Sequence, residues 1–138
     1  RDPDSEILTL PWARQLVTLI IGPEYSWEPS NPDHAKYWTH SYPSPALATM
    51  MGLVNFVRKS DLGSIEKPVL VIYSPNDTVM NSEKTEERVA EIGSEIKEIH
   101  PIIDSGNPDN HVLAGDILAP DNTQVVKDLI LDFISRLQ

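Results

Sequence analysis

Cysteine is absent from this 138-residue chain. The chain therefore has no disulfide bond, no thiolate nucleophile and no zinc site that depends on cysteine, although this absence does not identify a compartment. Basic residues are also scarce, with 11 Lys and Arg against 21 Asp and Glu and a formal net charge of -10. Because no run of basic residues is present to bind phosphates, nucleic acid is not expected as a partner.

Long apolar runs are missing as well. No stretch reaches the roughly 18 consecutive apolar residues of a membrane-spanning helix. The acidic start Arg1-Asp2-Pro3-Asp4 does not resemble the basic and apolar head of a signal peptide. The sequence also lacks an initiator methionine, so we expect a partial chain whose localisation stays unknown. The 40% of hydrophobic residues that it does contain suits one globular domain.

The first 60 residues predict two apolar helices joined by a loop. Thr9 can cap a helix that ends before Gly22, and Ser44-Pro45 begins a second helix with apolar residues three and four positions apart. Between them, the proline-rich residues 22–43 predict a loop with one short helix after Asn31-Pro32.

The rest of the chain predicts strands that alternate with helices. The apolar run at 68–74 is typical of a strand buried on both faces of a parallel sheet, and a second strand is expected at 96–103. The charged helix at 82–92 should lie on the outside and end at Gly93 with a left-handed cap.

The predicted sheet is incomplete. A last helix, capped by Asn122, carries an apolar stripe that needs a sheet to cover. Two strands do not make an independently stable parallel sheet. We therefore expect further strands from an absent amino-terminal portion, from a partner chain or from another copy of this chain. The predicted fold class is α/β, with residues 61–138 as the core segment and residues 1–60 as a helical segment leading into the sheet.

Two residues that suit acid–base chemistry follow the two predicted strands. Asp77 comes after the first strand and His111 after the second. Because the carboxyl ends of parallel strands share one edge, where open α/β sheets perform their chemistry, we expect the two side chains to meet there. In a catalytic triad an imidazole removes the proton of a serine hydroxyl, and a carboxylate orients that imidazole.

The serine that would complete such a triad has no counterpart in this sequence. None of the six glycines belongs to a G-x-S-x-G pentapeptide, which carries the nucleophile in hydrolases built on parallel sheets. This polypeptide alone should therefore not cleave esters.

Two segments resemble the α/β-hydrolase family. Residues 65–79, from Ile65 through Pro68 and the apolar strand to Asp77, are similar to the family's late strand and acid turn, and the acid precedes the histidine as it does there. Residues 110–116 are similar to the histidine loop of the serine aminopeptidase and monoacylglycerol-lipase-like branch. The resemblance implies the carboxy-terminal part of a carboxylesterase or lipase-like enzyme that acts on a small-molecule ester without a cofactor. Asp77 would orient His111, and His111 would activate the serine that this chain lacks.

Residues 1–60 resemble, more loosely, the cap or lid of this family. The resemblance implies that some of their aromatic and methionine side chains line an apolar acyl-binding wall. The candidates are Trp27, Trp38, Met50 and Met51. Such residues are more often part of a hydrophobic core.

Simpler interpretations stand beside these. An aspartate in a turn usually caps the backbone, and a lone loop histidine is usually ordinary. The spacing of Asp33, His34 and His40 matches no compact metal site, so we interpret them as residues of a solvated loop and assign no metal.

The alternative function is a non-catalytic α/β interaction module that forms a homo-oligomer through its incomplete sheet. A flavodoxin-like binding domain is a weaker alternative, because no glycine-rich phosphate loop supports it.

Overall fold

The computed structural model describes residues 18–137, and the chain divides between Ser60 and Asp61 into two compact units. It has a mixed α/β fold, in which the described residues form one antiparallel and one parallel pair of strands. The antiparallel pair lies in the first unit, which ends at Ser60, and the parallel pair lies in the second unit, from Asp61 onward.

The first unit begins, within the described residues, with a helical segment at 18–21. It ends at Gly22, whose φ of 93° is accessible to glycine without steric cost, and whose backbone N–H donates to the carbonyl of Thr18 at 3.1 Å. The rest of the helix that was predicted to start at Thr9 lies outside the described residues.

A short antiparallel strand pair occupies the segment that was predicted to be a loop. Strands β1 (Glu24–Ser26) and β2 (Ser41–Pro43) pair with Tyr25 opposite Tyr42, and the two rings lie 5.4 Å apart. The prediction of an irregular segment is wrong here, because three-residue strands are too short to show an alternating pattern. The short helix predicted between them is present as α2 (Pro32–Tyr37), capped by the side chain of Asn31.

Helix α3 (Pro45–Arg58) confirms the predicted second helix. Its buried residues, Leu47 and Met51, lie four positions apart and so share one face. The other apolar side chains of α3 include four that are exposed: Met50, Leu53, Phe56 and Val57. Met50 and Val57, which belong to the predicted apolar face, are therefore not covered by other described residues of this chain.

The second unit is built around a parallel strand pair joined by a helix. Strand β3 (Val69–Tyr73), helix α4 (Ser82–Ala90) and strand β4 (Lys97–Pro101) follow one another, and β3 pairs with β4 in parallel. Both strands lie within the predicted ranges. The ladder extends beyond the strands, since the N–H of Ile102 donates to the carbonyl of Tyr73 at 2.8 Å.

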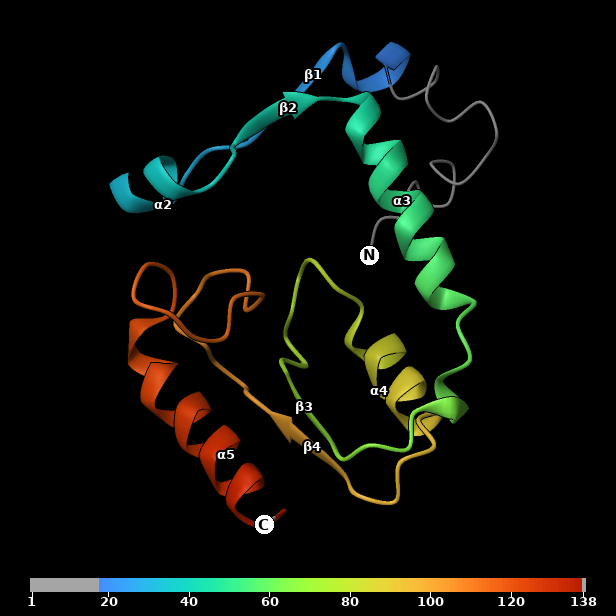
Figure 1. The fold of residues 1–138 in the computed structure, drawn as a ribbon. Coiled ribbons are helices and arrows are strands. Elements are labelled where there is room, and N and C mark those ends of the chain that lie inside the picture. The colour runs from blue at the N-terminus through green and yellow to red at the C-terminus, as the bar shows by residue number, and fades with distance from the viewer. Residues whose placement is uncertain (1–17, 138) are drawn as a thin grey trace. The chain divides into compact units, whose positions relative to one another are not determined.

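Helices cover the two faces of this strand pair, which lies between α4 and α5 (Thr123–Ser135) in Figure 1. On one face the hydroxyl of Tyr73 donates to Glu86 of α4. On the other face Glu98 of β4 accepts hydrogen bonds from Arg136, the residue that ends α5. Because alternate residues of a strand point to opposite faces, this arrangement gives a layer of helix on each side of the sheet.

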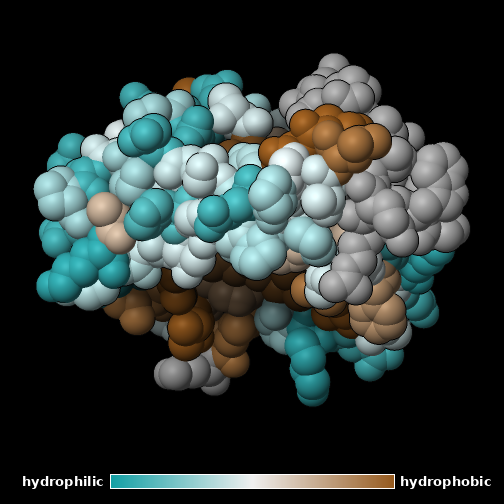
Figure 2. Space-filling view, turned by 90° about the horizontal axis from the view of Figure 1, so that it is seen from above, coloured by the Kyte–Doolittle hydropathy of each residue, from teal (hydrophilic) through white to brown (hydrophobic). Residues whose placement is uncertain are grey.

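The hydrophobic core of the second unit is small. Only Ile102, Ala119 and Phe133 are buried apolar residues among those that the structure describes in this unit, and every residue of β3 is half-buried. The prediction that β3 is buried on both faces is therefore not met within this chain, because the described residues give β3 a single neighbouring strand. Apolar residues reach the surface, as Figure 2 shows.

The prediction of a left-handed cap at Gly93 is wrong. Gly93 is not among the described glycines with positive φ, which are Gly22, Gly106 and Gly115. Instead, Gly93 follows α4 where the chain approaches the 3-10 helix η2 (Leu62–Ser64) so closely that a Cβ atom would overlap a carbonyl oxygen.

Asn122 occupies the predicted N-cap position of α5, but its side chain makes no capping hydrogen bond there. It ends the 3-10 helix η3 (Pro120–Asn122), and its side-chain amide donates to the carbonyl of Asp104 at 2.9 Å. The side-chain amide of Asn122 thus binds the segment that follows β4, and α5 begins without a side-chain capping bond.

Candidate active site

Asp77 lies in the turn that follows β3. The N–H of Asp77 donates to the carbonyl of Ser74 at 3.3 Å, which closes the turn. Its Oδ1 atom accepts from the backbone N–H groups of Val79 and Met80 at 2.7 and 2.8 Å. One carboxylate oxygen therefore stabilises the turn, and the other is left for a different partner.

His111 follows a compact series of turns after β4. The Oδ1 atom of Asn110 accepts from the N–H of Ser105 at 2.9 Å, and the N–H of Asn110 donates to the carbonyl of Asn107 at 2.9 Å. Asn110 has a φ of 50°, a left-handed conformation that asparagine adopts more readily than most residues. These bonds reverse the chain so that His111 returns toward the end of β3.

The two predicted catalytic residues meet at this edge of the strand pair. The Nδ1 atom of His111 lies 2.9 Å from Oδ2 of Asp77. Because an ionised carboxylate can only accept, Nδ1 carries the hydrogen of this bond. In the neutral ring the Nε2 atom is then an acceptor, which is the form in which a histidine can take a proton from a hydroxyl.

The environment of Asp77 keeps it ionised. Burial of the carboxyl raises its pKa, but hydrogen bonds from His111, Met80 and Val79 lower the pKa by more, so that it lies below its ordinary value. The side chain of Asp77 is only 12% exposed, whereas that of His111 is 43% exposed. The carboxylate is thus held beneath a ring that is open to solvent.

The hydroxyl groups of the neighbouring segments have other partners. Ser74 and Ser105 are buried, and each accepts from a backbone N–H two residues later. The hydroxyl of Thr78 lies against Asp109. None of these three hydroxyls is hydrogen-bonded to His111 in the part of the chain that the structure describes.

Asn76 and Thr78 also lie at this site, although neither was predicted as a site residue. The side-chain amide of Asn76 donates to the carbonyl of Ile103 at 2.9 Å, and the N–H of Thr78 donates to the carbonyl of Asp109 at 3.0 Å. Both residues flank the predicted acid in sequence.

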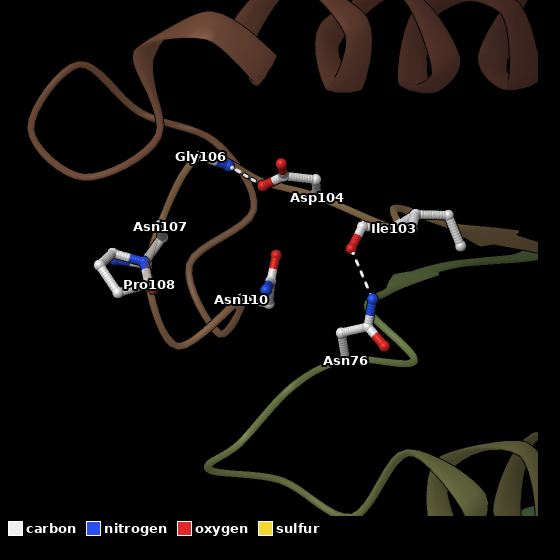
Figure 3. A pocket seen from close by; sticks show the side chains of 7 residues that line it. All are labelled: Asn76, Ile103, Asp104, Gly106, Asn107, Pro108 and Asn110. Carbon is white, nitrogen blue, oxygen red and sulfur yellow. Dashed lines mark hydrogen bonds between the residues drawn. The ribbon is translucent and has the colours of Figure 1, made fainter.

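An open hollow lies between the same two segments. It is lined by Asn76 from the acid turn and by residues after β4, namely Ile103, Asp104, Gly106, Asn107, Pro108 and Asn110 (Figure 3). Asp77 and His111 are not among the lining residues, and the side chains shown are mostly engaged in turns. We therefore do not assign the hollow to the substrate.

The candidate substrate residues of the first unit fall into two groups. Trp27 and Trp38 flank His34, with ring centroids 4.6 and 5.2 Å from the imidazole. Met51 of α3 is buried and Met50 is half exposed. The two tryptophans are thus brought together, the two methionines differ in exposure, and an acyl-binding wall stays a prediction.

His34 is buried, so its interpretation as part of a solvated loop is wrong. Its Nδ1 atom accepts from the N–H of Ser30 at 3.2 Å, a local bond for which the sequence pattern gives no signal. Among residues 18–137, no group of three or more His, Asp or Glu side chains is placed to hold a metal ion. Within the same residues, no helix combines the length and apolar character needed to cross a membrane.

Comparison of the chain with protein-family models, with curated proteins and with solved structures finds no match. The interpretation of the site therefore depends on its own geometry and on the resemblance of the two segments described above.

Proposed function

We propose that this chain supplies the acid and the base of a serine hydrolase, as the carboxy-terminal part of an α/β-hydrolase that cleaves carboxylic esters. The observation that supports the proposal best is the 2.9 Å hydrogen bond between Nδ1 of His111 and Oδ2 of Asp77. The two residues come from turns 34 positions apart in sequence and meet beyond the carboxyl ends of two parallel strands.

In the proposed reaction His111 acts as general base and then as general acid. Its Nε2 atom takes the proton of a serine hydroxyl as the oxygen attacks the ester carbonyl, and then gives that proton to the departing alcohol. Water attacks the resulting acyl-enzyme with the same assistance and releases the acid. Asp77 stabilises the imidazolium formed in each step and holds the ring in the Nδ1–H tautomer.

The nucleophile in this proposal comes from polypeptide other than the described residues. The character of the two strands supports this. β3 is apolar from Val69 to Ile72, as a central strand would be, whereas β4 contains Lys97, Glu98 and Pro101, which suit a sheet edge. The half-buried β3 therefore suits a further strand on its unpaired side, and the segment with the serine would accompany that strand.

An ester is proposed as the substrate because of the resemblance to the lipase-like branch. A fold does not by itself fix a substrate, and a peptide bond is the alternative for the same machinery. The four candidate substrate residues Trp27, Trp38, Met50 and Met51 would favour an apolar acyl group, since indole and thioether side chains bind such groups well.

The decisive experiment measures hydrolysis of p-nitrophenyl esters by the chain alone and by the chain extended with whatever coding sequence precedes Arg1. We expect no turnover by the chain alone and turnover by the extended protein. His111→Ala should reduce the turnover number at least about 1,000-fold, as the loss of a triad member does.

His100→Ala is the matched control. His100 belongs to the same unit and faces Glu98 rather than Asp77, so its removal should leave turnover unchanged. Full activity of the His111→Ala protein would reject the proposed function.

A self-associating interaction module is the second candidate, and the exposed apolar residues of α3 favour it. Leu53 and Phe56 are 64% and 73% exposed. This candidate predicts a homogeneous oligomer of the chain in light scattering, and an extended protein with no esterase activity.

A further inference from the structure

The residues on either side of Asp77 both bind the segment that carries His111. Before Asp77, the Nδ2 atom of Asn76 donates to the carbonyl of Ile103 at 2.9 Å (Figure 3). After Asp77, the N–H of Thr78 donates to the carbonyl of Asp109 at 3.0 Å, and its hydroxyl lies 3.2 Å from Oδ1 of Asp109. The acid turn is thus joined to the histidine segment at two points that bracket the acid.

These bonds matter because the other hydrogen bonds of Asp77 and Asn110 lie within the acid turn or within the histidine segment, and do not join the two. His111 is 43% exposed and lies outside any helix or strand. A hydrogen bond of 2.9 Å is lost when the two atoms separate by less than about 1 Å, because at about 3.6 Å a contact no longer counts as one. Small displacements of either segment would therefore break the pair unless the segments move together.

We propose that Asn76 and Thr78 are positioning residues, which keep Asp77 and His111 within hydrogen-bond distance by joining the acid turn to the histidine segment. They do not touch the reacting groups themselves. The importance of Asn76 and Thr78 for catalysis rests on the proposed function. Their effect on the distance between Asp77 and His111 does not.

The direct measure of this role is the tautomer of His111. A neutral imidazole carries its hydrogen on the nitrogen that has the better acceptor partner, and here that partner is Asp77. If the two segments separate, the Nδ1–H form loses this advantage. Nitrogen-15 chemical shifts of the ring distinguish the two tautomers in the unextended chain, and no nucleophile is needed.

The test compares Asn76→Ala, Thr78→Val and the double variant with the unaltered chain. We expect the ratio of Nδ1–H to Nε2–H tautomer to fall about tenfold in the double variant, which corresponds to the loss of about 1.4 kcal/mol from the bond to the carboxylate. Thr78→Val alone should have a smaller effect, because its backbone N–H still donates to Asp109.

Two controls separate positioning from a general loss of structure. Thr78→Ser keeps the hydroxyl and should restore the ratio. Thr85→Val removes a hydroxyl that donates to the carbonyl of Asn81, the N-cap residue of α4. The backbone N–H of Thr85 still donates to that carbonyl, so the substitution should change nothing at His111.

An unchanged tautomer ratio in the double variant would overturn the inference. If the double variant does not fold, Asn76→Ala alone decides the question, since the Asn76 side-chain bond is an exposed one. The double variant can change the tautomer ratio of His111 while the extended protein without these substitutions shows no esterase activity. That outcome would support the positioning role and reject the proposed hydrolase.

Discussion

Arg136 binds Glu98 through the two terminal nitrogens of its guanidinium group, Nη1 and Nη2, at 2.5 and 2.8 Å from the two carboxylate oxygens. The pair joins the end of α5 to the edge strand β4. The hydrogen bonds from Arg136, with a further one from His100, lower the pKa of Glu98 to about 2. A bidentate arginine fixes orientation as well as distance, so the pair sets where the last helix lies on the strands.

The first prediction concerns the pH dependence of this pair. Because the pKa of Glu98 is lower in the folded chain than its ordinary 4.5, the stabilisation is complete above that value and is lost as the pH falls toward about 2. Arg136→Met should therefore lower the thermal midpoint at pH 7, and the difference from the unaltered chain should disappear in strong acid.

Salt provides the control for this prediction. Both partners are partly exposed, so added salt should screen the pair and reduce the difference at pH 7. Lys84→Met, at a more exposed ion pair with Glu87 within α4, should have a smaller effect. A difference for Arg136→Met that persists unchanged at about pH 2 would contradict the assignment.

The sequence predicted the regular part of the second unit well, because its signals are local. The apolar run of β3 and the charged helix α4 each carry a pattern that one stretch of chain contains in full. The meeting of Asp77 and His111 was also predictable, since it follows from two strands running parallel. The catalytic role of the two residues and their family remain predictions.

The features that were missed depend on contacts between distant segments. Strands β1 and β2 are three residues each and exist only because they pair with one another. Gly93 lies close to η2, and the need for glycine there comes from Gly63, thirty positions away. Asn122 looks like a helix cap, yet its amide bonds to Asp104. No local pattern distinguishes these roles.

The second prediction follows from Gly93. A Cβ atom at this position would overlap the carbonyl oxygen of Gly63, and backbone atoms cannot move aside as a flexible side chain can. Gly93→Ala should therefore destabilise the chain by about 1–3 kcal/mol, the range for overpacking. Urea unfolding monitored by circular dichroism measures the change.

Gly52→Ala is the matched control for Gly93. Gly52 lies within α3, and nothing stands within 4 Å of the position that its Cβ atom would take. Alanine there should stabilise the helix by about 0.5–1 kcal/mol, since glycine is the poorer helix former. If Gly93→Ala does not destabilise the chain, the close approach of Gly93 to Gly63 is not maintained in solution.

The third prediction concerns the carboxyl of Asp77. Burial raises its pKa, and the hydrogen bonds from His111, Met80 and Val79 lower it by more. His111→Ala removes one of the lowering bonds and leaves the two backbone bonds in place, so the pKa of Asp77 should rise. Carbon-13 resonances of the carboxyl, followed through an acid titration, measure the change.

The sign of the effect on stability follows from the same shift. Because the folded pKa of Asp77 lies below its ordinary 3.8, ionised Asp77 stabilises the fold above that pH, and this contribution is lost as the pH falls through the folded value. His111→Ala should therefore be less stable than the unaltered chain at neutral pH, with a difference that shrinks in acid.

His100→Ala, which removes a partner of Glu98 instead, should leave the Asp77 resonance unaffected. An Asp77 titration identical in the His111→Ala and unaltered chains would mean that the two side chains do not bond in solution, and the proposed base would lose its partner.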